Sequence, residues 1–216
     1  MVQVKICGIT NWPDAKRAAD AGADLLGFNF YPGSPRYIEP RRARRIIRQL
    51  PARVTPVGVF VNDLPGAVVE LAEYTGVRVA QLHGEESPAA TRHIAAHLPV
   101  IKAFRARRGF RLARLGQYTA AFALLLDGFS IRFRGGTGKT FDWRLARTAR
   151  RYGRVFLAGG LTPENVGEAM RRARPYGVDV CTGVESRPGK KSGRKLCALF
   201  DAIERARRGP RGRKSE

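Results

Sequence analysis

The stretch VFLAGGLTPENV, residues 155–166, decides how the fold of the whole chain is interpreted. It begins with four apolar residues, which are followed by the glycine pair Gly159 and Gly160. Thr162 then reads as a helix N-cap and Pro163 as the first helical residue, where the missing N–H of proline costs nothing. A short buried run, a glycine turn and a capped helix together predict one strand–helix unit of a parallel sheet.

The same unit recurs along the chain. Short apolar runs, rich in β-branched and aromatic residues, begin near residues 2, 25, 54, 79, 100, 123, 155 and 178. The predicted helices are Pro13–Ala21, Pro40–Leu50, Pro65–Tyr74, Pro88–Leu98, Gly109–Tyr118, Asp142–Tyr152, Pro163–Ala173 and Ser192–Arg207. Eight alternating units favour a single (β/α)8 TIM barrel over the alternative, a doubly wound open sheet. We expect the barrel to span residues 1–204 and a flexible basic tail to follow at residues 205–216.

Composition narrows the class of protein. The chain has 216 residues, 44% of them hydrophobic, which is enough for one full-size core. Its three cysteines have irregular spacing and form no C-x-x-C pair, which argues against a disulfide framework or a zinc ribbon and for a reducing compartment. The N-terminus lacks the apolar segment of a secretory signal, and the longest apolar run, Ala120–Leu126, is too short to cross a membrane. We therefore expect a soluble, cytoplasmic protein without a membrane partner.

The charge balance indicates an anionic partner. Forty Lys and Arg residues against 18 Asp and Glu residues give a formal net charge of +22. Such a field attracts nucleic acids, acidic surfaces or a small phosphorylated molecule. The sequence contains no helix-turn-helix, ribonucleoprotein motif or zinc finger, so we expect no specific nucleic-acid partner. It leaves open whether the chain is a monomer or a homodimer.

The segment GGTGKTFDW, Gly135–Trp143, contains the GKT of a nucleotide-binding phosphate loop. That loop requires a glycine five residues before Gly138, and this position is Phe133. The segment also comes late in the connection after the sixth apolar run, whereas a phosphate loop follows its strand directly. We interpret it as a mobile active-site loop whose glycines permit bending.

Active sites of TIM barrels lie at the C-terminal ends of the strands. Cys7 ends the first apolar run, and Lys5, two residues earlier, should point to the same side. A nearby ammonium group favours the thiolate, so Cys7 is a candidate catalytic residue, although free cysteines are also commonly small buried hydrophobes. Asp127 ends the sixth run. A partly desolvated carboxyl group there can donate a proton, or it can serve as an ordinary loop cap.

Three loops are candidates for binding anionic groups. Gly159 and Gly160 follow the seventh run, and Thr182 and Gly183 follow the eighth. Loops in these two positions often bind phosphate in TIM barrels through backbone N–H groups, so we expect a phosphorylated small-molecule substrate there. Arg36, after the second run, has the geometry to bind a carboxylate, but it could equally be a solvated surface charge.

The motifs of the chain, taken together and in order, resemble those of the phosphoribosylanthranilate isomerase family of tryptophan biosynthesis. They are VKICGIT, GFNFYPGSPRYI, VGVFVN, QLHGEE, LLLD, GGTGKTFDW, LAGGLTPENV and DVCTGVESRPGKK, and they extend over residues 2–191. The resemblance implies a (β/α)8 barrel with no metal and no cofactor. It also implies the Amadori rearrangement of N-(5-phosphoribosyl)anthranilate to 1-(2-carboxyphenylamino)-1-deoxyribulose 5-phosphate.

The resemblance further implies a role for each matching residue. Cys7, the cysteine of VKICGIT, would be the general base, and Asp127, at the end of LLLD, would be the general acid. Arg36 would hold the anthranilate carboxylate, and Gly160 and Gly183 would lie in the two phosphate-binding loops.

The chain departs from the family at Cys181 and Thr182, where members commonly carry serine. The sequence therefore leaves open whether the side chains at these positions contact phosphate, and we interpret Cys181 as a packed thiol.

The sister isomerase of histidine biosynthesis catalyses the same rearrangement but would be expected to carry an aspartate where Cys7 stands. A second activity on its substrate stays open. Indole-glycerol phosphate synthase is disfavoured, because its lysine and glutamate pattern has no match here.

Overall fold

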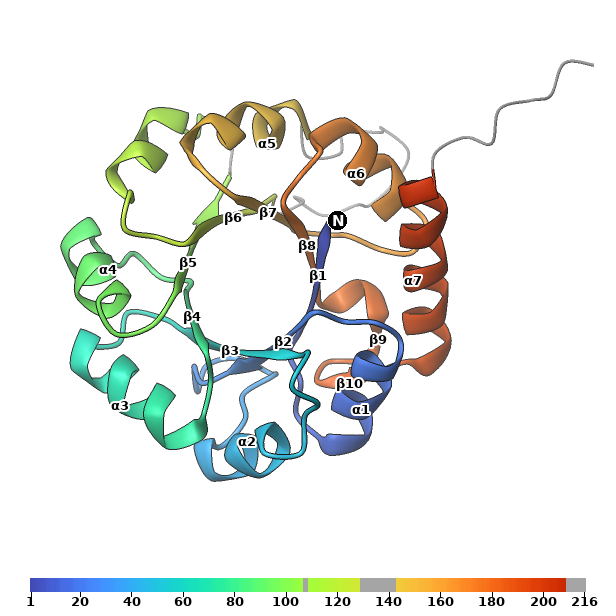
Figure 1. Cartoon of the computed structure of the whole chain (residues 1–216), viewed down its shortest axis with the longest axis horizontal. Coiled ribbons are helices and arrows are strands. Elements are labelled where there is room, and N and C mark those ends of the chain that lie inside the picture. Colours follow the sequence, from blue (N-terminus) through green and yellow to red (C-terminus); the bar gives the residue numbers. More distant parts are fainter. Residues whose placement is uncertain (107–108, 129–142, 209–216) are drawn as a thin grey trace, which may run out of the picture.

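The computed structural model describes residues 1–106, 109–128 and 143–208. Its centre is a closed barrel of eight parallel strands in chain order (Figure 1). The strands are β1 (Gln3–Cys7), β2 (Leu25–Asn29), β3 (Thr55–Phe60), β4 (Val79–Leu82), β5 (Val100–Arg105), β6 (Ala123–Asp127), β7 (Val155–Ala158) and β8 (Gly177–Val180). The predicted (β/α)8 barrel is confirmed, because β8 pairs with β1 and an open sheet would leave both strands as edges.

Helices form a ring around the barrel (Figure 1). They are α1 (Trp12–Asp20), α2 (Pro40–Ile47), α3 (Pro65–Thr75), α4 (Pro88–Ala95), α5 (Trp143–Ala149), α6 (Val166–Ala173) and α7 (Gly193–Arg208). Three short 3-10 helices and a hairpin also occur: η1 (Leu112–Gln117), η2 (Arg150–Tyr152), η3 (Thr182–Val184), β9 (Glu185–Arg187) and β10 (Lys190–Lys191). The last helix, α7, packs against α6 and α1, so the end of the chain covers its beginning.

Each barrel strand has one face inside the barrel and one against the helices. On β6, Ala123 and Leu125 belong to the apolar cluster inside the barrel. Leu124 and Leu126 belong to the outer cluster under the helices. Since residues two apart share a face, Asp127 ends β6 on the inner side.

The same alternation places the residues of β1. Val4 and Ile6 belong to the outer cluster. Lys5 and Cys7 therefore face the inside of the barrel, as the sequence predicted.

One predicted helix has a different form. The segment predicted as the helix Gly109–Tyr118 contains the 3-10 helix η1 instead. The segment is short and contains Gly116, a residue that is unfavourable inside an α-helix.

Helix α6 begins later than predicted. Its first residue is Val166 and its N-cap is Asn165, so the prediction of Thr162 as the N-cap was wrong. The N–H of Thr162 donates to Asn165 Oδ1 at 2.8 Å, and the N–H of Glu164 donates to Thr162 Oγ1 at 3.3 Å. These bonds form a turn ahead of the helix, because short polar side chains compete with the helix for backbone groups.

Helix α7 runs past the domain boundary expected at residue 204, and residues 205–208 are helical. The rest of the expected tail, 209–216, lies outside the described residues. So does most of the predicted active-site loop, since α5 begins at Trp143. Within residues 1–106, 109–128 and 143–208, no helix combines the length and apolar character needed to span a membrane.

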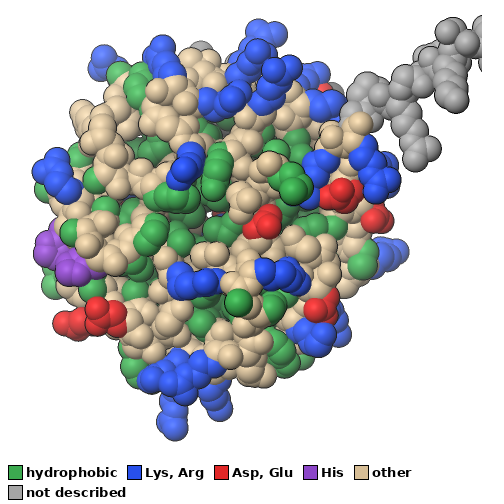
Figure 2. Space-filling model, viewed as in Figure 1, with side chains coloured by type: hydrophobic (Ala, Val, Ile, Leu, Met, Phe, Trp, Pro, Cys, Tyr) green, Lys and Arg blue, Asp and Glu red, His purple; other side chains and the backbone are tan. Residues whose placement is uncertain are grey.

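Much of the positive charge lies on solvated helix faces. Helix α2 buries Ala43 and Ile46 while Arg41, Arg42 and Arg45 are exposed. On the face shown in Figure 2, Lys and Arg side chains are spread around the outline of the molecule. This distribution is the one expected for charges that line the outer surfaces of amphipathic helices.

Candidate active site

A cavity of about 670 Å³ opens at the C-terminal ends of the barrel strands. Its lining includes six of the seven predicted site residues: Cys7, Arg36, Asp127, Gly159, Gly160 and Thr182. The seventh, Gly183, packs behind it, where a Cβ atom would clash with the carbonyl group of Leu161. Strand ends that are far apart in the sequence therefore meet around one space.

Two buried charges lie at the wall of the cavity, where Asp179 forms part of the lining. Lys5 and Asp179 are register partners on β1 and β8, and Lys5 Nζ lies 2.9 Å from Asp179 Oδ1. Burial raises the pKa of Asp179 to about 6, although the ammonium group of Lys5 acts in the opposite direction. Burial alone would lower the pKa of Lys5, but the charges of Asp179 and Cys7 outweigh this effect and raise it. Lys5 is therefore a fixed positive charge at this wall.

Cys7 is partly exposed to the cavity, and its surroundings hold the pKa of its thiol well below the ordinary value. A hydrogen bond with the thiol of Cys181 is the main cause of its lowered pKa. The charges of Lys5 and Lys191 lower the pKa of Cys7 further, against the opposing effect of burial.

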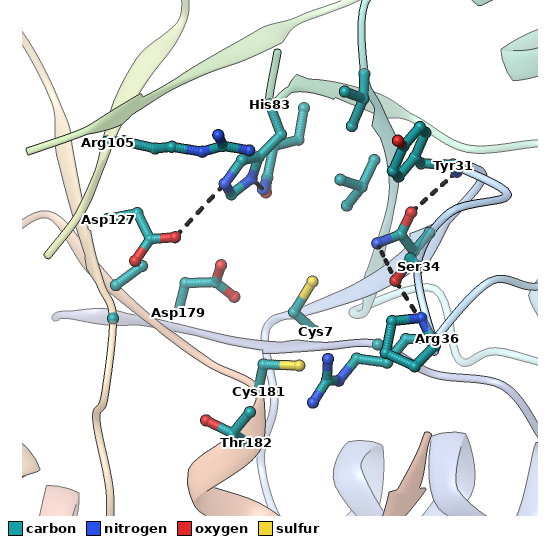
Figure 3. Close-up of a pocket in the computed structure, with 18 of the residues that line it drawn as sticks. Cys7, Tyr31, Ser34, Arg36, His83, Arg105, Asp127, Asp179, Cys181 and Thr182 are labelled. Atoms are coloured by element: carbon teal, nitrogen blue, oxygen red, sulfur yellow. Dashed lines mark hydrogen bonds and ion pairs between the residues drawn. The ribbon is translucent and has the colours of Figure 1, made fainter. Parts of the chain in front are cut away.

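Cys181 is the partner that keeps its proton. The hydrogen bond with Cys7 raises the pKa of Cys181, and burial adds to this shift. The interpretation of Cys181 as a packed thiol was wrong, because it lines the cavity beside Cys7 (Figure 3). The register of β1 and β8, which no local pattern reveals, brings the two thiols together.

Asp127 lies on the other side of the cavity from Cys7 (Figure 3). Its Oδ2 is 3.5 Å from His83 Nε2, and His83 Nδ1 is 2.9 Å from the side-chain nitrogen of Gln81. Because this amide donates to Nδ1, the proton of a neutral His83 ring lies on Nε2, toward Asp127. His83 thereby orients the carboxyl group.

The loops after β7 and β8 approach the cavity through their backbone. Gly159 and Gly160 have φ angles of 89° and 68°, in the left-handed region that favours glycine. A Cβ atom on Gly159 would lie 2.6 Å from Asp127 Oδ1, so glycine lets this loop pass beside the carboxyl group. Thr182 begins η3, and the first N–H groups of a helix have no partner within it, which suits an anionic ligand group.

Arg36 is held by an acidic side chain. Its Nε and Nη2 atoms donate to the carboxylate of Glu185 at 2.7–3.2 Å. Glu185 also lies 2.9 Å from Lys191 Nζ. One edge of the guanidinium group is thus occupied, and a ligand carboxylate would meet the edge that carries Nη1.

Sequence reasoning assigned no role to Asp179, His83 or Glu185. Asp179 stands inside the buried run VDV, and a charge in such a run needs a partner, which is a signal that could have found it. His83 directly follows β4, at a strand end. Glu185 lies in the β9–β10 hairpin and had no signal in the sequence.

The arrangement suits acid–base chemistry on a small anionic molecule. A carboxyl group and a thiolate face a shared space, and Arg36 and two backbone loops offer contacts to anions. Over the described ranges, no cluster of three or more His, Cys, Asp or Glu side chains could hold a metal ion.

Comparisons with known proteins agree on one family. The family model described as N-(5'phosphoribosyl)anthranilate (PRA) isomerase matches residues 4–202. The N-(5'-phosphoribosyl)anthranilate isomerase of Trichlorobacter lovleyi is 50% identical over 197 residues, which cover 91% of this chain and 95% of that protein.

Solved structures agree with the sequence comparison. The phosphoribosyl anthranilate isomerase structure from Thermotoga maritima has a TM-score of 0.87 at 44% identity, covering 94% of this chain and 99% of that one. Another isomerase structure, in complex with reduced 1-(o-carboxyphenylamino)-1-deoxyribulose 5-phosphate, has a TM-score of 0.85 at 42% identity, with the same coverage of 94% and 99%.

Proposed function

The chain belongs to the N-(5'-phosphoribosyl)anthranilate isomerase family and is an isomerase of tryptophan biosynthesis; from this premise we propose that Cys7 is its general base and Asp127 its general acid. The reaction is the Amadori rearrangement of N-(5-phosphoribosyl)anthranilate to 1-(2-carboxyphenylamino)-1-deoxyribulose 5-phosphate. It needs one proton donor and one proton acceptor at different atoms of the sugar. One observation carries the assignment: Cys7 and Asp127 face the same cavity from opposite sides.

The first step opens the ribose ring. Asp127, in its carboxylic acid form, donates a proton to the ring oxygen as the bond between C1 and that oxygen breaks. The lone pair of the anilino nitrogen completes a protonated Schiff base at C1. His83, 3.5 Å from the carboxyl group, holds Asp127 in place for this transfer.

The second step removes the proton from C2. The iminium group acidifies this proton, and the thiolate of Cys7 accepts it to give an enolamine, which tautomerises to the ketone. The hydrogen bond from Cys181 and the charges of Lys5 and Lys191 lower the pKa of Cys7, which favours the thiolate that accepts this proton. A general acid or base typically contributes about 10²–10⁴-fold to the rate.

The active site would bind the substrate at its two charged ends, the anthranilate carboxylate and the phosphate. Arg36 would bind the anthranilate carboxylate through the guanidinium edge that Glu185 leaves open. The phosphate would be held by backbone N–H groups of the loops after β7 and β8. The residues of these loops are Gly159, Gly160, Thr182 and Gly183.

The test follows the anthranilate fluorescence of freshly prepared substrate. We expect rapid loss of fluorescence with the unmodified chain and a kcat about 10²–10⁴-fold lower for Cys7→Ala and for Asp127→Asn. Cys197→Ala is the matched control, because Cys197 is an exposed thiol on α7. Circular dichroism would check that all variants are folded. Near-normal turnover in a folded Cys7→Ala or Asp127→Asn variant would remove that residue from the mechanism.

We also propose a cytoplasmic location, because the thiol of Cys7 has to stay reduced to accept a proton. Sedimentation of the purified chain would distinguish the monomer from the homodimer, both of which the sequence allows.

A further inference from the structure

Cys7 and Cys181 occupy neighbouring positions on adjacent strands. Cys7 is the last residue of β1, Cys181 directly follows β8, and the register pairs Ile6 with Val180, the residues just before them. Neighbouring strands lie about 4.7–4.9 Å apart. Disulfide bonds join residues whose Cα atoms are about 4.4–6.8 Å apart, so the backbone spacing suits a bond between these two cysteines.

The two cysteine side chains share one wall of the cavity. Cys7 and Cys181 both belong to the lining, and Figure 3 shows them next to each other. Gly8 directly follows Cys7, and a Cβ atom added to Gly8 would lie 3.1 Å from Cys181 Sγ. The sulfur of Cys181 is therefore close to the backbone next to Cys7. Since the cavity is open to solvent-borne small molecules, a reagent that reaches Cys7 also meets Cys181.

The surrounding positive charges activate one thiol of this pair, Cys7, whereas Cys181 keeps its proton. Lys191 Nζ lies 3.8 Å from Cys181 Sγ, and Lys5 is buried beside Cys7. Positive charge stabilises a thiolate, which is the nucleophilic form of cysteine. A thiolate with a second thiol beside it is the arrangement found at redox-sensing cysteines.

We propose that Cys7 and Cys181 are a peroxide-reactive thiol pair that forms a reversible intramolecular disulfide and thereby switches the isomerase off. The thiolate of Cys7 attacks one oxygen of a hydroperoxide; the O–O bond breaks, Cys7 becomes a sulfenic acid, and the leaving alkoxide or hydroxide takes up a proton. Cys181 then loses its proton and attacks the Cys7 sulfur. The S–O bond breaks, and the departing hydroxide takes the proton and leaves as water. Two sulfur atoms have lost two electrons to the peroxide.

The disulfide has two consequences. It removes the proton acceptor, because the sulfur of Cys7 no longer carries a free thiolate. It also protects Cys7 from further oxidation to the sulfinic acid, which is irreversible for most proteins. A dithiol such as dithiothreitol would restore both thiols, which fits the transient disulfides of reducing compartments.

The experiment uses the full chain with Cys197→Ser as the parent, so that Cys7 and Cys181 are its only thiols. The parent is treated with a small excess of hydrogen peroxide, quenched with catalase, alkylated and analysed by intact mass and by non-reducing peptide mapping. We expect loss of two hydrogens, a cross-linked peptide pair containing Cys7 and Cys181, and resistance to alkylation. In the oxidised fraction activity should fall by about 10²–10⁴-fold, as for removal of a general base, and dithiothreitol should restore it.

The comparison variant is Cys181→Ser in the same parent, because serine can keep a hydrogen bond to Cys7 but cannot form the disulfide. We expect its Cys7 to gain two oxygen atoms and its activity loss to resist dithiothreitol. A parent that shows no cross-linked peptide, or a Cys181→Ser variant that recovers as fully as the parent, would overturn the proposal. The activity readout rests on the proposed role of Cys7, whereas the mass readout does not. A disulfide without loss of activity would therefore reject Cys7 as the base and the switch with it, while the reactive pair would stand.

Discussion

Lys5 and Asp179 form a buried ion pair that joins the first and last strands of the barrel at the catalytic cavity, whose lining includes Asp179. Their side chains meet at 2.9 Å, and the Lys5 side chain has no exposed surface. The charge of the same ammonium group lowers the pKa of Cys7, so one side chain links closure of the barrel to the chemistry of the thiol.

Lys5→Met should be strongly destabilising. It leaves Asp179 as a buried carboxylate without its partner, and breaking a buried pair from one side typically costs about 3–5 kcal/mol. The double variant Lys5→Met/Asp179→Leu should recover most of this loss in urea unfolding, because neither charge remains. A single variant as stable as the parent would show that the pair contributes little to the fold. In the folded fraction of Lys5→Met, the acid limb of kcat/KM should move to higher pH, because Cys7 loses a positive neighbour.

Asp179 should make stability fall as pH rises from about 4 to about 6. Burial raises its pKa in the folded chain to about 6 from an ordinary value of 3.8, so the folded state binds the proton more tightly than the unfolded state. The associated stability is present below the ordinary value and is lost as pH rises through the folded value. A shift of about two units corresponds to roughly 3 kcal/mol. Unfolding of Asp179→Asn over this range should lack that decline, and parallel curves for both chains would contradict the assignment.

Arg36→Ala should raise KM more than it lowers kcat. A charge-assisted hydrogen bond is worth about 1.5–3 kcal/mol, which corresponds to a KM increase of about 10–100-fold. Arg36→Lys should recover only part of the affinity, because an ammonium group cannot form two parallel bonds to a carboxylate.

Glu185→Gln tests how Arg36 is oriented. The variant removes the charge that holds the guanidinium group while leaving Arg36 itself in place, and we expect a smaller increase in KM than for Arg36→Ala. Steady-state kinetics of the three variants would measure this order. An unchanged KM in Arg36→Ala would mean that the anthranilate carboxylate is bound elsewhere.

Gly159→Ala should impair both folding and turnover. Its φ of 89° is strained for alanine, and the added Cβ atom would lie 2.6 Å from Asp127 Oδ1 and 2.5 Å from the carbonyl oxygen of Gly128. Gly109→Ala is the matched control, because Gly109 has a φ of 85° but no atom within 4 Å of the added Cβ. Both variants should lose about 1–3 kcal/mol from backbone strain, and only Gly159→Ala should also lose kcat. Equal kcat values in the two variants would show that the loop does not position Asp127.

The sequence by itself determined the architecture and the strand-end residues. Alternation of apolar runs with amphipathic segments is local, and so is the rule that residues two apart share a strand face. These patterns were sufficient to place Lys5 and Cys7 on one face and Asp127 at a strand end. They predicted the first residues of helices less accurately. Helix α6 begins at Val166 and not at Pro163, because Thr162 and Asn165 form a hydrogen-bonded turn ahead of it.

Only the tertiary structure decided which side chains touch. Lys5 and Asp179 are 174 residues apart, and Arg36 and Glu185 are 149 apart. Their contacts depend on closure of β8 onto β1 and on the axial register of that pair, which also places Cys181 beside Cys7. Strand parity reveals the face on which a side chain lies, but register is set by packing of the whole barrel. A thiol that the sequence indicates as ordinary core thereby becomes the neighbour that tunes Cys7.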